Sequence, residues 1–127
     1  MKVKKANLEL ENMLASLSSV IDRTDVIGYT AAKNTLAIQG AITAYIETRD
    51  RLIEKYGDQE TDANGVPTGR MHIDPSMDDF PAFLEELQQI ANRESKVTVE
   101  TLPYAEAIGK ISGTQLLALD WMFEEGD

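Results

Sequence analysis

Apolar residues recur with the spacing of a helix along residues 8–21, where they form one stripe. The members of that stripe are Leu10, Met13, Leu14, Leu17, Val20 and Ile21. Steps of three and four residues bring side chains to the same face of an α-helix, so the pattern predicts an amphipathic helix here. Asn7 directly precedes the stretch and is a candidate N-cap.

A longer stripe predicts a second helix from Val26 to Tyr56. Its positions, separated by alternate steps of four and three, are Ala31, Thr35, Ile38, Ile42, Tyr45, Arg49, Leu52 and Tyr56. Thr24 or Asp25 can cap its start, and Gly57 follows where helices often end in a left-handed residue. Residues 8–21 alone are too short to cover this helix. Its remainder must therefore pack on the C-terminal half or on another copy of the chain.

Small residues form a strip on the same helix, at Ala37, Gly40, Ala41 and Ala44. Because small side chains allow two helix backbones to approach closely, the strip predicts a helix–helix contact. A contact within the chain is favoured over a contact between two copies.

Turn residues and alternating residues predict two strands. Residues 57–78 are rich in Gly, Pro, Asp and Asn, and Asn64-Gly65 is a strong hairpin signal with residues 70–73 as the returning strand. Residues 96–102, KVTVETL, alternate and are β-branched, which predicts a second strand.

Two further helices are predicted in the second half of the chain. One runs from about residue 77 to residue 93, with Pro81 in its first turn and Ser76 and Asp79 as a capping box. The other opens at Ser112, with Gln115 as its capping-box partner. Apolar residues occupy most sides of this last helix, so we expect it to be buried in the core or against a partner. They are Leu116, Leu117, Leu119, Trp121, Met122 and Phe123.

Together these elements predict a single α+β domain over residues 1–127, dominated by helices. We expect a long antiparallel helical hairpin, with a third and a C-terminal helix packed beside a small antiparallel β-sheet. Residues 66–73 and 96–102 would form that sheet, with Lys2 to Lys5 as a candidate third strand. A length of 127 residues suits one hydrophobic core.

The composition excludes several classes of functional site. The chain has no cysteine, which excludes disulfides, thiolate zinc sites and cysteine nucleophiles. No apolar run approaches the ~20 residues that cross a bilayer, and the first residues do not have the pattern of a secretory signal. We therefore expect a cytoplasmic protein without membrane association.

The net charge of −10 is unevenly distributed. Residues 1–73 carry ten acids and nine bases, whereas residues 74–127 carry twelve acids and three bases. Binding to a phosphate backbone needs clustered Lys or Arg, so direct binding to nucleic acid is not expected. The acidic surface either keeps the protein soluble or engages a basic partner.

Residues 58–69, DQETDANGVPTG, have part of the pattern of a calcium-binding loop. Counted from Glu60, oxygen-bearing residues occupy the first three ligand positions of such a loop, and Gly65 occupies its glycine position. The final position, which needs a bidentate glutamate, is Met71. We therefore interpret the segment as a hairpin turn and predict no metal site.

The sequence contains no recognisable catalytic motif. His72 is the only histidine, and its one evident partner is Asp74, on the same strand face. The chain has no nucleophile elbow, no glycine-rich phosphate loop and no paired-histidine metal motif. We therefore expect neither an enzyme nor a bound cofactor.

The order of several segments resembles that of small proteins from tailed bacteriophages and prophages. These segments lie between about residue 44 and the C-terminus and read ETRDRLIEKYG, DANG, FPAFLEELQQI, KVTVETLP and ISGTQLLALDWMFEE. The resemblance implies a phage or prophage origin. It assigns no functional residue.

Two functional classes follow from these features. The first is a non-enzymatic phage or prophage accessory protein that acts by protein–protein binding, as an acidic inhibitor occupying a basic surface of a host defence or nucleic-acid-binding protein. The alternative is a virion-assembly or structural accessory protein. In both classes we expect a homodimer or a hetero-complex in the bacterial cytoplasm. The candidate partner-binding residues are Glu85, Glu86, Glu94, Glu124, Glu125 and Trp121.

Overall fold

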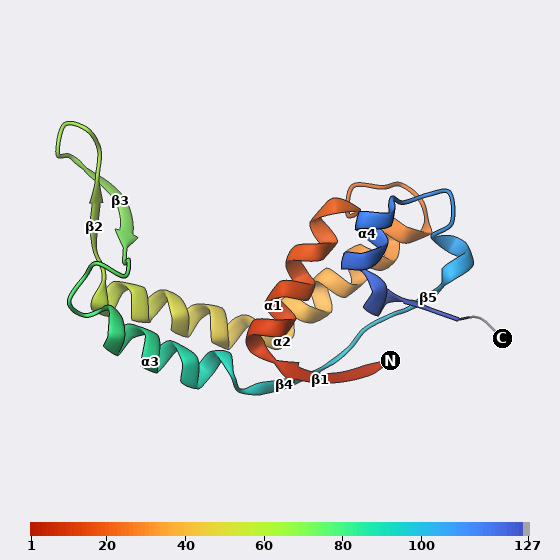
Figure 1. The fold of residues 1–127 in the computed structure, drawn as a ribbon, viewed down its shortest axis with the longest axis horizontal. Helices are drawn as coiled ribbons and strands as arrows, with labels where there is room; N and C mark the ends of the chain where they lie inside the picture. Colours follow the sequence, from red (N-terminus) through yellow and green to blue (C-terminus); the bar gives the residue numbers. More distant parts are fainter. Residues whose placement is uncertain (126–127) are drawn as a thin grey trace. The chain divides into compact units, whose positions relative to one another are not determined.

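Helices make up most of the regular structure in the computed structural model, which describes residues 1–125 (Figure 1). The α-helices are α1 (Asn7–Ser16), α2 (Val26–Tyr56), α3 (Phe80–Ala91) and α4 (Gly113–Ala118). The strands are β1 (Lys2–Ala6), β2 (Asp58–Thr61), β3 (Pro67–His72), β4 (Glu94–Thr98), β5 (Leu102–Pro103) and β6 (Phe123–Glu124). Short 3₁₀ turns cover Leu17–Ser19, Tyr104–Glu106 and Asp120–Met122. The expected α+β fold dominated by helices is confirmed.

The contacts within the chain divide it into two compact units. Met1–Ile42 belongs to the first unit together with the chain from Glu94 onward, and Thr43–Arg93 forms the second unit. The long helix α2 contributes residues to both units.

Three two-stranded sheets replace the single sheet expected from the sequence. β1 pairs with β4 and β2 with β3, both antiparallel, whereas β5 pairs with β6 in parallel. The expected place of residues 2–5 beside the strand that begins near residue 96 is confirmed. The expected pairing of residues 66–73 with residues 96–102 is wrong, because β3 pairs with β2. The short turn between β2 and β3 brings them together at a small loop-closure cost.

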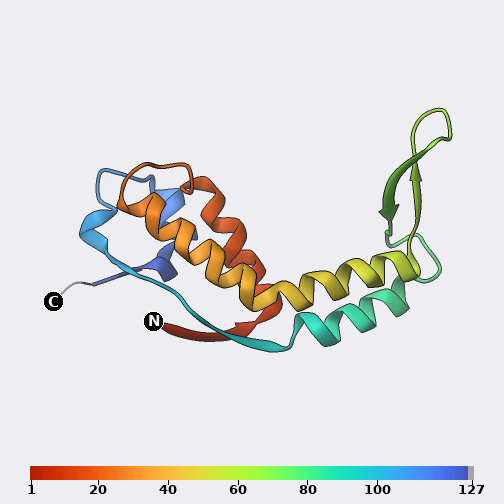
Figure 2. The same ribbon diagram turned by 180° about the vertical axis from the view of Figure 1, so that it is seen from behind.

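The core of the first unit forms where α1 lies beside the first half of α2 (Figure 1, Figure 2). The buried apolar residues of these segments are Leu10, Met13, Leu17, Val20, Ile27, Ala31, Ile38 and Ile42. The predicted first helix is shorter than expected, because α1 ends at Ser16 and a 3₁₀ turn continues the chain. The predicted stripe is confirmed except at Leu14 and Ile21, which are only partly buried.

Asn7 does not cap α1. It lies in the first turn of the helix, where its Oδ1 accepts a hydrogen bond from the Ser95 hydroxyl at 2.6 Å. The predicted cap is therefore wrong, because Asn7 is engaged instead by a residue of β4.

The helix α2 begins and ends where the sequence predicts it. The Asp25 carboxylate caps its start by accepting a hydrogen bond from the Gly28 N–H at 3.3 Å. The Arg23 guanidinium donates to the same carboxylate, with a closest nitrogen–oxygen distance of 2.5 Å. This hydrogen bonding lowers the pKa of Asp25 to about 2.

Gly57 follows α2 as expected, but it is not left-handed. A Cβ built on Gly57 would lie 2.5 Å from the carbonyl oxygen of Ile53 and 2.7 Å from that of His72. The close approach of two backbone segments therefore requires glycine at this position.

The strip of small residues on α2 does not serve the expected contact at its centre. A Cβ built on Gly40 would meet no atom of another segment within 4 Å. The predicted helix–helix contact within the chain is therefore wrong at Gly40.

In the second unit α3 packs with the second half of α2. The ring of Phe83, which is buried, meets the ring of Tyr56 edge-on at a centroid distance of 6.5 Å. α3 begins at Phe80, later than expected, and Pro81 lies in its first turn as predicted. The predicted capping box is wrong, because the Ser76 hydroxyl and N–H both donate to Asp74.

The last helix opens with the capping box that the sequence predicts. The Ser112 hydroxyl oxygen accepts from the Gln115 N–H at 3.0 Å, and Gln115 Oε1 accepts from the Ser112 N–H at 2.9 Å. α4 ends at Ala118, and of the remaining apolar residues Trp121 and Met122 lie in a 3₁₀ turn and Phe123 in β6.

A buried amide fastens the chain that leaves β4 to the middle of α2. Asn34 is 1% exposed, and its Nδ2 donates to the carbonyl oxygen of Glu100 at 3.0 Å while its Oδ1 accepts from the Glu100 N–H at 2.7 Å. Both backbone groups of Glu100 are thereby satisfied by one side chain, and the preceding Val99 is fully buried.

Replacing Asn34 with Ala should destabilise the protein by about 1–3 kcal/mol, because two backbone groups of Glu100 lose their partner in a poorly hydrated place. Urea unfolding followed by circular dichroism measures the loss. Asn12→Ala, at an exposed position of α1, is the matched control and should change stability by less than ~0.5 kcal/mol. Equal stabilities of the two variants would contradict the structural role given to Asn34.

The Asp25 carboxylate should make stability depend on pH in the acid range. Its pKa is about 2 in the folded protein and 3.8 in an unperturbed carboxyl, so the ionised form stabilises the fold fully above ~pH 4. That contribution is lost as the pH falls from ~4 through ~2. In thermal melts over this range, Asp25→Asn should lose less stability on acidification than the wild type, and parallel losses would contradict the assignment.

Candidate partner-binding surface

The segment that carries part of a calcium-loop pattern is the turn of the β2–β3 hairpin. The Asp62 Oδ1 accepts hydrogen bonds from the N–H groups of Asn64 at 2.8 Å and Val66 at 3.0 Å. Gly65 has a φ of 78°, which confirms the predicted Asn64-Gly65 turn. The Asp62 carboxylate, a candidate metal ligand in the calcium-loop pattern, thus stabilises the turn by hydrogen bonds. Within residues 1–125 no group of three or more potential His, Cys, Asp or Glu ligands is found.

His72 and Asp74 meet as the sequence suggested, with 2.5 Å between His72 Nε2 and Asp74 Oδ2. The other carboxylate oxygen accepts from the hydroxyl and N–H of Ser76. Hydrogen bonds from Ser76 and His72 lower the pKa of Asp74 to about 2. A nucleophilic triad needs the imidazole between the hydroxyl and the carboxylate, whereas here the carboxylate lies in the middle. The cluster therefore stabilises the loop that precedes α3.

Two of the candidate partner-binding glutamates lie side by side on α3, in the second unit. Glu85 is exposed, whereas Glu86 is partly buried and its Oε1 lies 3.4 Å from Lys55 Nζ. Lys55 also lies over the ring of Tyr56, at 4.8 Å from its centroid. Glu86 is therefore already paired with a base, and Glu85 remains the freer charge of the two.

The other three candidate glutamates belong to the first unit. Glu94 is exposed on β4, and Glu124 and Glu125 are exposed neighbours at the end of the described chain. Among the described residues, no ion pair involves Glu85 or any of these three. Four of the five candidate glutamates therefore present uncompensated negative charge to solvent.

Trp121 is only partly buried. Its Nε1 donates to the Ser16 hydroxyl at 3.4 Å, and its ring borders a shallow hollow beside α1. The neighbouring Leu119, Met122 and Phe123 are buried, whereas Leu117 is 83% exposed. The predicted burial in the core is thus confirmed for Leu119, Met122 and Phe123, whereas burial of Leu117 against a partner stays a prediction.

The sequence reasoning did not recognise a basic surface on β1 and β4. Lys2 and Lys4 are two residues apart on β1, and Lys96 pairs with Lys4 across the ribbon. The alternation of Lys2, Val3 and Lys4 is visible in the sequence. Its significance depends on the strand pairing, which brings Lys96 to the same face.

Comparison with known proteins adds no relative: no protein-family model, curated protein or solved structure matches the chain. Within the described residues, no helix combines the length and hydrophobicity that crossing a membrane would take.

Replacing Trp121 with Ala should lower the free energy of unfolding by about 1–3 kcal/mol, less than for a fully buried indole, because part of the ring is already in water. Urea unfolding measures the loss, and acrylamide should quench the fluorescence of this single tryptophan in the native protein. Leu117→Ala, which removes an exposed side chain, is the control and should change stability by less than ~0.5 kcal/mol. A fully quencher-protected indole would contradict the partial burial.

Proposed function

We propose that this chain is a non-enzymatic phage or prophage accessory protein that binds a basic surface of a host protein, as an acidic inhibitor of a defence or nucleic-acid-binding protein. The observation that carries the proposal is the exposure of Glu85, Glu94, Glu124 and Glu125 without a basic partner among the described residues. The phage origin rests on the resemblance of the sequence segments alone.

The charge distribution supports this proposal. Twelve acids and three bases occur in residues 74–127, which contain all five candidate glutamates. Exposed charges of one sign attract a surface of the opposite sign over about one Debye length and raise the rate of encounter. Such a protein would compete with the phosphate backbone for the basic surface of a nucleic-acid-binding partner.

Exposed apolar side chains favour a second candidate function, virion assembly or a structural accessory role. Leu36, Ile108 and Leu117 are each more than 70% exposed. A larger complex could cover these residues and thereby gain hydrophobic stabilisation. In that case binding would depend on apolar contacts and would be nearly independent of salt.

The acidic surface is tested by affinity capture from bacterial lysate, identification of the retained protein, and measurement of its association rate. The surface variant carries Glu85→Gln, Glu94→Gln, Glu124→Gln and Glu125→Gln. The control variant carries Asp22→Asn, Glu47→Gln, Asp50→Asn and Glu54→Gln, which are exposed acids other than the candidate glutamates. Both variants have the same net charge, so the comparison separates the candidate glutamates from the overall charge.

We expect the surface variant to associate at least ~10-fold more slowly than the wild type at low salt, with a smaller change in dissociation rate. The control should associate within about 3-fold of the wild type, and raising the salt should weaken the wild-type complex steeply. Equal effects of the two variants would contradict a specific role of the candidate glutamates. Binding whose affinity does not change with salt concentration, and which is lost in Leu117→Ser, would support the assembly role instead.

A further inference from the structure

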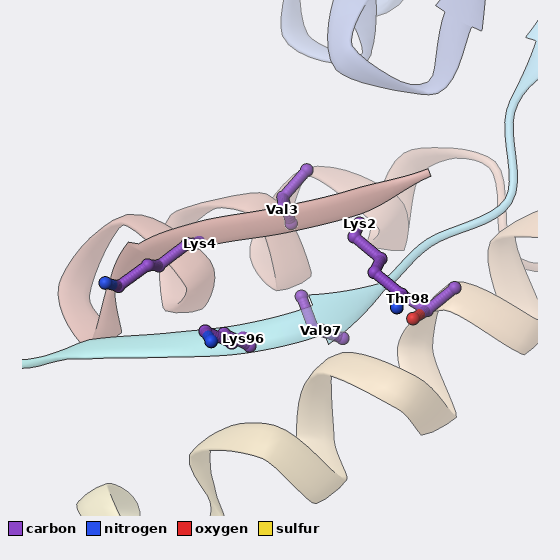
Figure 3. A pocket seen from close by; sticks show the side chains of 6 residues that line it. All are labelled: Lys2, Val3, Lys4, Lys96, Val97 and Thr98. Atoms are coloured by element: carbon purple, nitrogen blue, oxygen red, sulfur yellow. The ribbon is translucent and has the colours of Figure 1, made fainter.

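Three lysines lie on one face of the β1–β4 ribbon. The antiparallel register places Lys4 opposite Lys96 and Lys2 opposite Thr98. Side chains two residues apart on a strand point to the same side, so Lys2 and Lys4 share the face of Lys96. All three are exposed. They border a hollow of about 440 Å³ together with Val3, Val97 and Thr98 (Figure 3).

The backbone pairing brings two of these lysines close together. The Val99 N–H donates to the Met1 carbonyl at 2.8 Å, and the Met1 amine donates to the Val99 carbonyl at 2.7 Å. Hydrogen-bonded and non-hydrogen-bonded pairs alternate along an antiparallel ribbon. Counting from the Met1–Val99 pair, Lys4 and Lys96 form a non-hydrogen-bonded pair, in which side chains are closest. Like charges in such positions destabilise the ribbon.

No acid within the described chain forms an ion pair with these lysines. Lys2, Lys4 and Lys96 form no ion pair among residues 1–125, although the sequence has 22 acids. Lys5 faces the other side of the ribbon and lies 3.9 Å from Glu9. The one acid on the lysine face is Glu94, which is opposite Ala6 at the far end of the ribbon.

The outer edge of β1 is open. β1 pairs with β4 alone in the described structure, so its outer edge adjoins no strand. Because Lys2 and Lys4 belong to non-hydrogen-bonded pairs, their N–H and C=O groups point outward along that edge. A further strand could bond to them and bring its own side chains beside the lysines.

The β2 strand has the matching pattern of acids. Asp58 and Glu60 are two residues apart, are exposed, and form no ion pair among the described residues. β2 pairs with β3 alone, so it too has an open edge. The carbonyl of Glu60 accepts from the Thr68 hydroxyl at 3.2 Å, and the Asp62 N–H donates to the Val66 carbonyl at 2.9 Å.

These two bonds direct the Glu60 carbonyl and the Asp62 N–H toward β3, on a stretch where the β2–β3 register shifts between Gln59 and Thr61. The groups of Gln59 and Thr61 therefore point to the open edge. In a parallel pair, a residue whose backbone groups face the neighbouring strand lies opposite a residue whose groups face away from it. A parallel approach of β2 to β1 would accordingly place Lys4 opposite Glu60.

We propose that the chain self-associates by adding β2 of one copy, in parallel, to the open edge of β1 in a second copy. Lys4 then lies opposite Glu60, and Lys2 lies opposite Asp58. The acids offset the repulsion between Lys4 and Lys96, and the added strand satisfies outward backbone groups of β1. If each of two copies adds its β2 to the β1 of the other, a closed dimer results. If each copy adds its β2 to a different copy, an open chain of molecules results. Of the candidate glutamates only Glu94 lies on this face, at the far end of the ribbon, and the contact itself uses none of them, so either proposal can fail alone.

A second copy fits this edge better than nucleic acid. A long phosphate strand would bring further negative charge against a protein of net charge −10. A second copy also has a net charge of −10, but its β2 edge offers backbone hydrogen-bonding groups as well as two carboxylates, which a phosphate strand does not. The open edge of β1 carries two lysines two residues apart, and the open edge of β2 carries two acids with the same spacing. Both edges belong to the same chain, so a second copy can supply the complementary edge.

Charge reversal tests the contact. Sedimentation velocity from ~10 µM to ~1 mM should show dimers or larger species of the wild type. Lys4→Glu and Glu60→Lys should each weaken association at least ~10-fold, because each places like charges opposite one another. A chain carrying both substitutions has the wild-type net charge and should regain association.

Two controls separate the contact from general effects of charge. Lys5→Glu alters the other face of the same strand, and Glu47→Lys alters an exposed position of α2. Both should associate within about 3-fold of the wild type. Amide exchange at Lys4 and Thr61 should slow as the protein concentration rises, because both N–H groups become bonded at the new edge.

Several results would overturn the proposal. A wild type that is monomeric up to ~1 mM forms no such contact. Loss of association in Lys4→Glu but not in Glu60→Lys would mean that something other than β2 occupies the edge. Failure of the doubly substituted chain to recover would exclude the pairing of these two residues. Stronger association of Lys4→Gln would show that the lysine protects the edge from pairing. Tighter binding of oligothymidylate than of a second copy would assign the lysines to phosphate.

Discussion

The side-chain amide of Asn34 makes the contact on which the arrangement of the first unit depends. It donates to and accepts from the backbone of Glu100 as a neighbouring strand would, at a position almost closed to water. The chain that leaves β4 is thereby held against α2, with Val99 fully buried between the ribbon and the rest of the core. An aliphatic side chain at position 34 would fill the space but leave the backbone of Glu100 without a partner.

The register of the β1–β4 ribbon follows from this attachment and decides which side chains meet solvent. Val3 lies opposite Val97, which is buried, whereas Lys4 lies opposite Lys96 on the exposed face. A slip of one residue would exchange the two faces and bury the lysines. The burial of Val97 and Val99 therefore imposes the unfavourable lysine pair, and that pair is the basis of the proposed self-association.

Uncompensated charge of both signs underlies the two proposals, which differ in the range over which charge acts. The candidate glutamates present negative charge for a basic partner, whereas the lysine face is positive within a chain of net charge −10. Long-range repulsion between copies opposes self-association, so the proposed contact relies on short-range pairing and backbone hydrogen bonds. The proposed binding to a basic protein would instead gain from the long-range field.

The sequence by itself determined the elements whose signals are local. The α2 boundaries, the Asp25 cap, the Asn64-Gly65 turn and the Ser112 capping box were all predictable, because each depends on residues within a few positions of one another. The β5–β6 pairing, the exposure of Leu117 and the pairing of Glu86 with Lys55 depend on contacts between distant segments, so only the tertiary structure decided them. The same holds for the lysine face. The sequence shows the alternation of Lys2 and Lys4, but only the pairing of β1 with β4 places Lys96 on the same face.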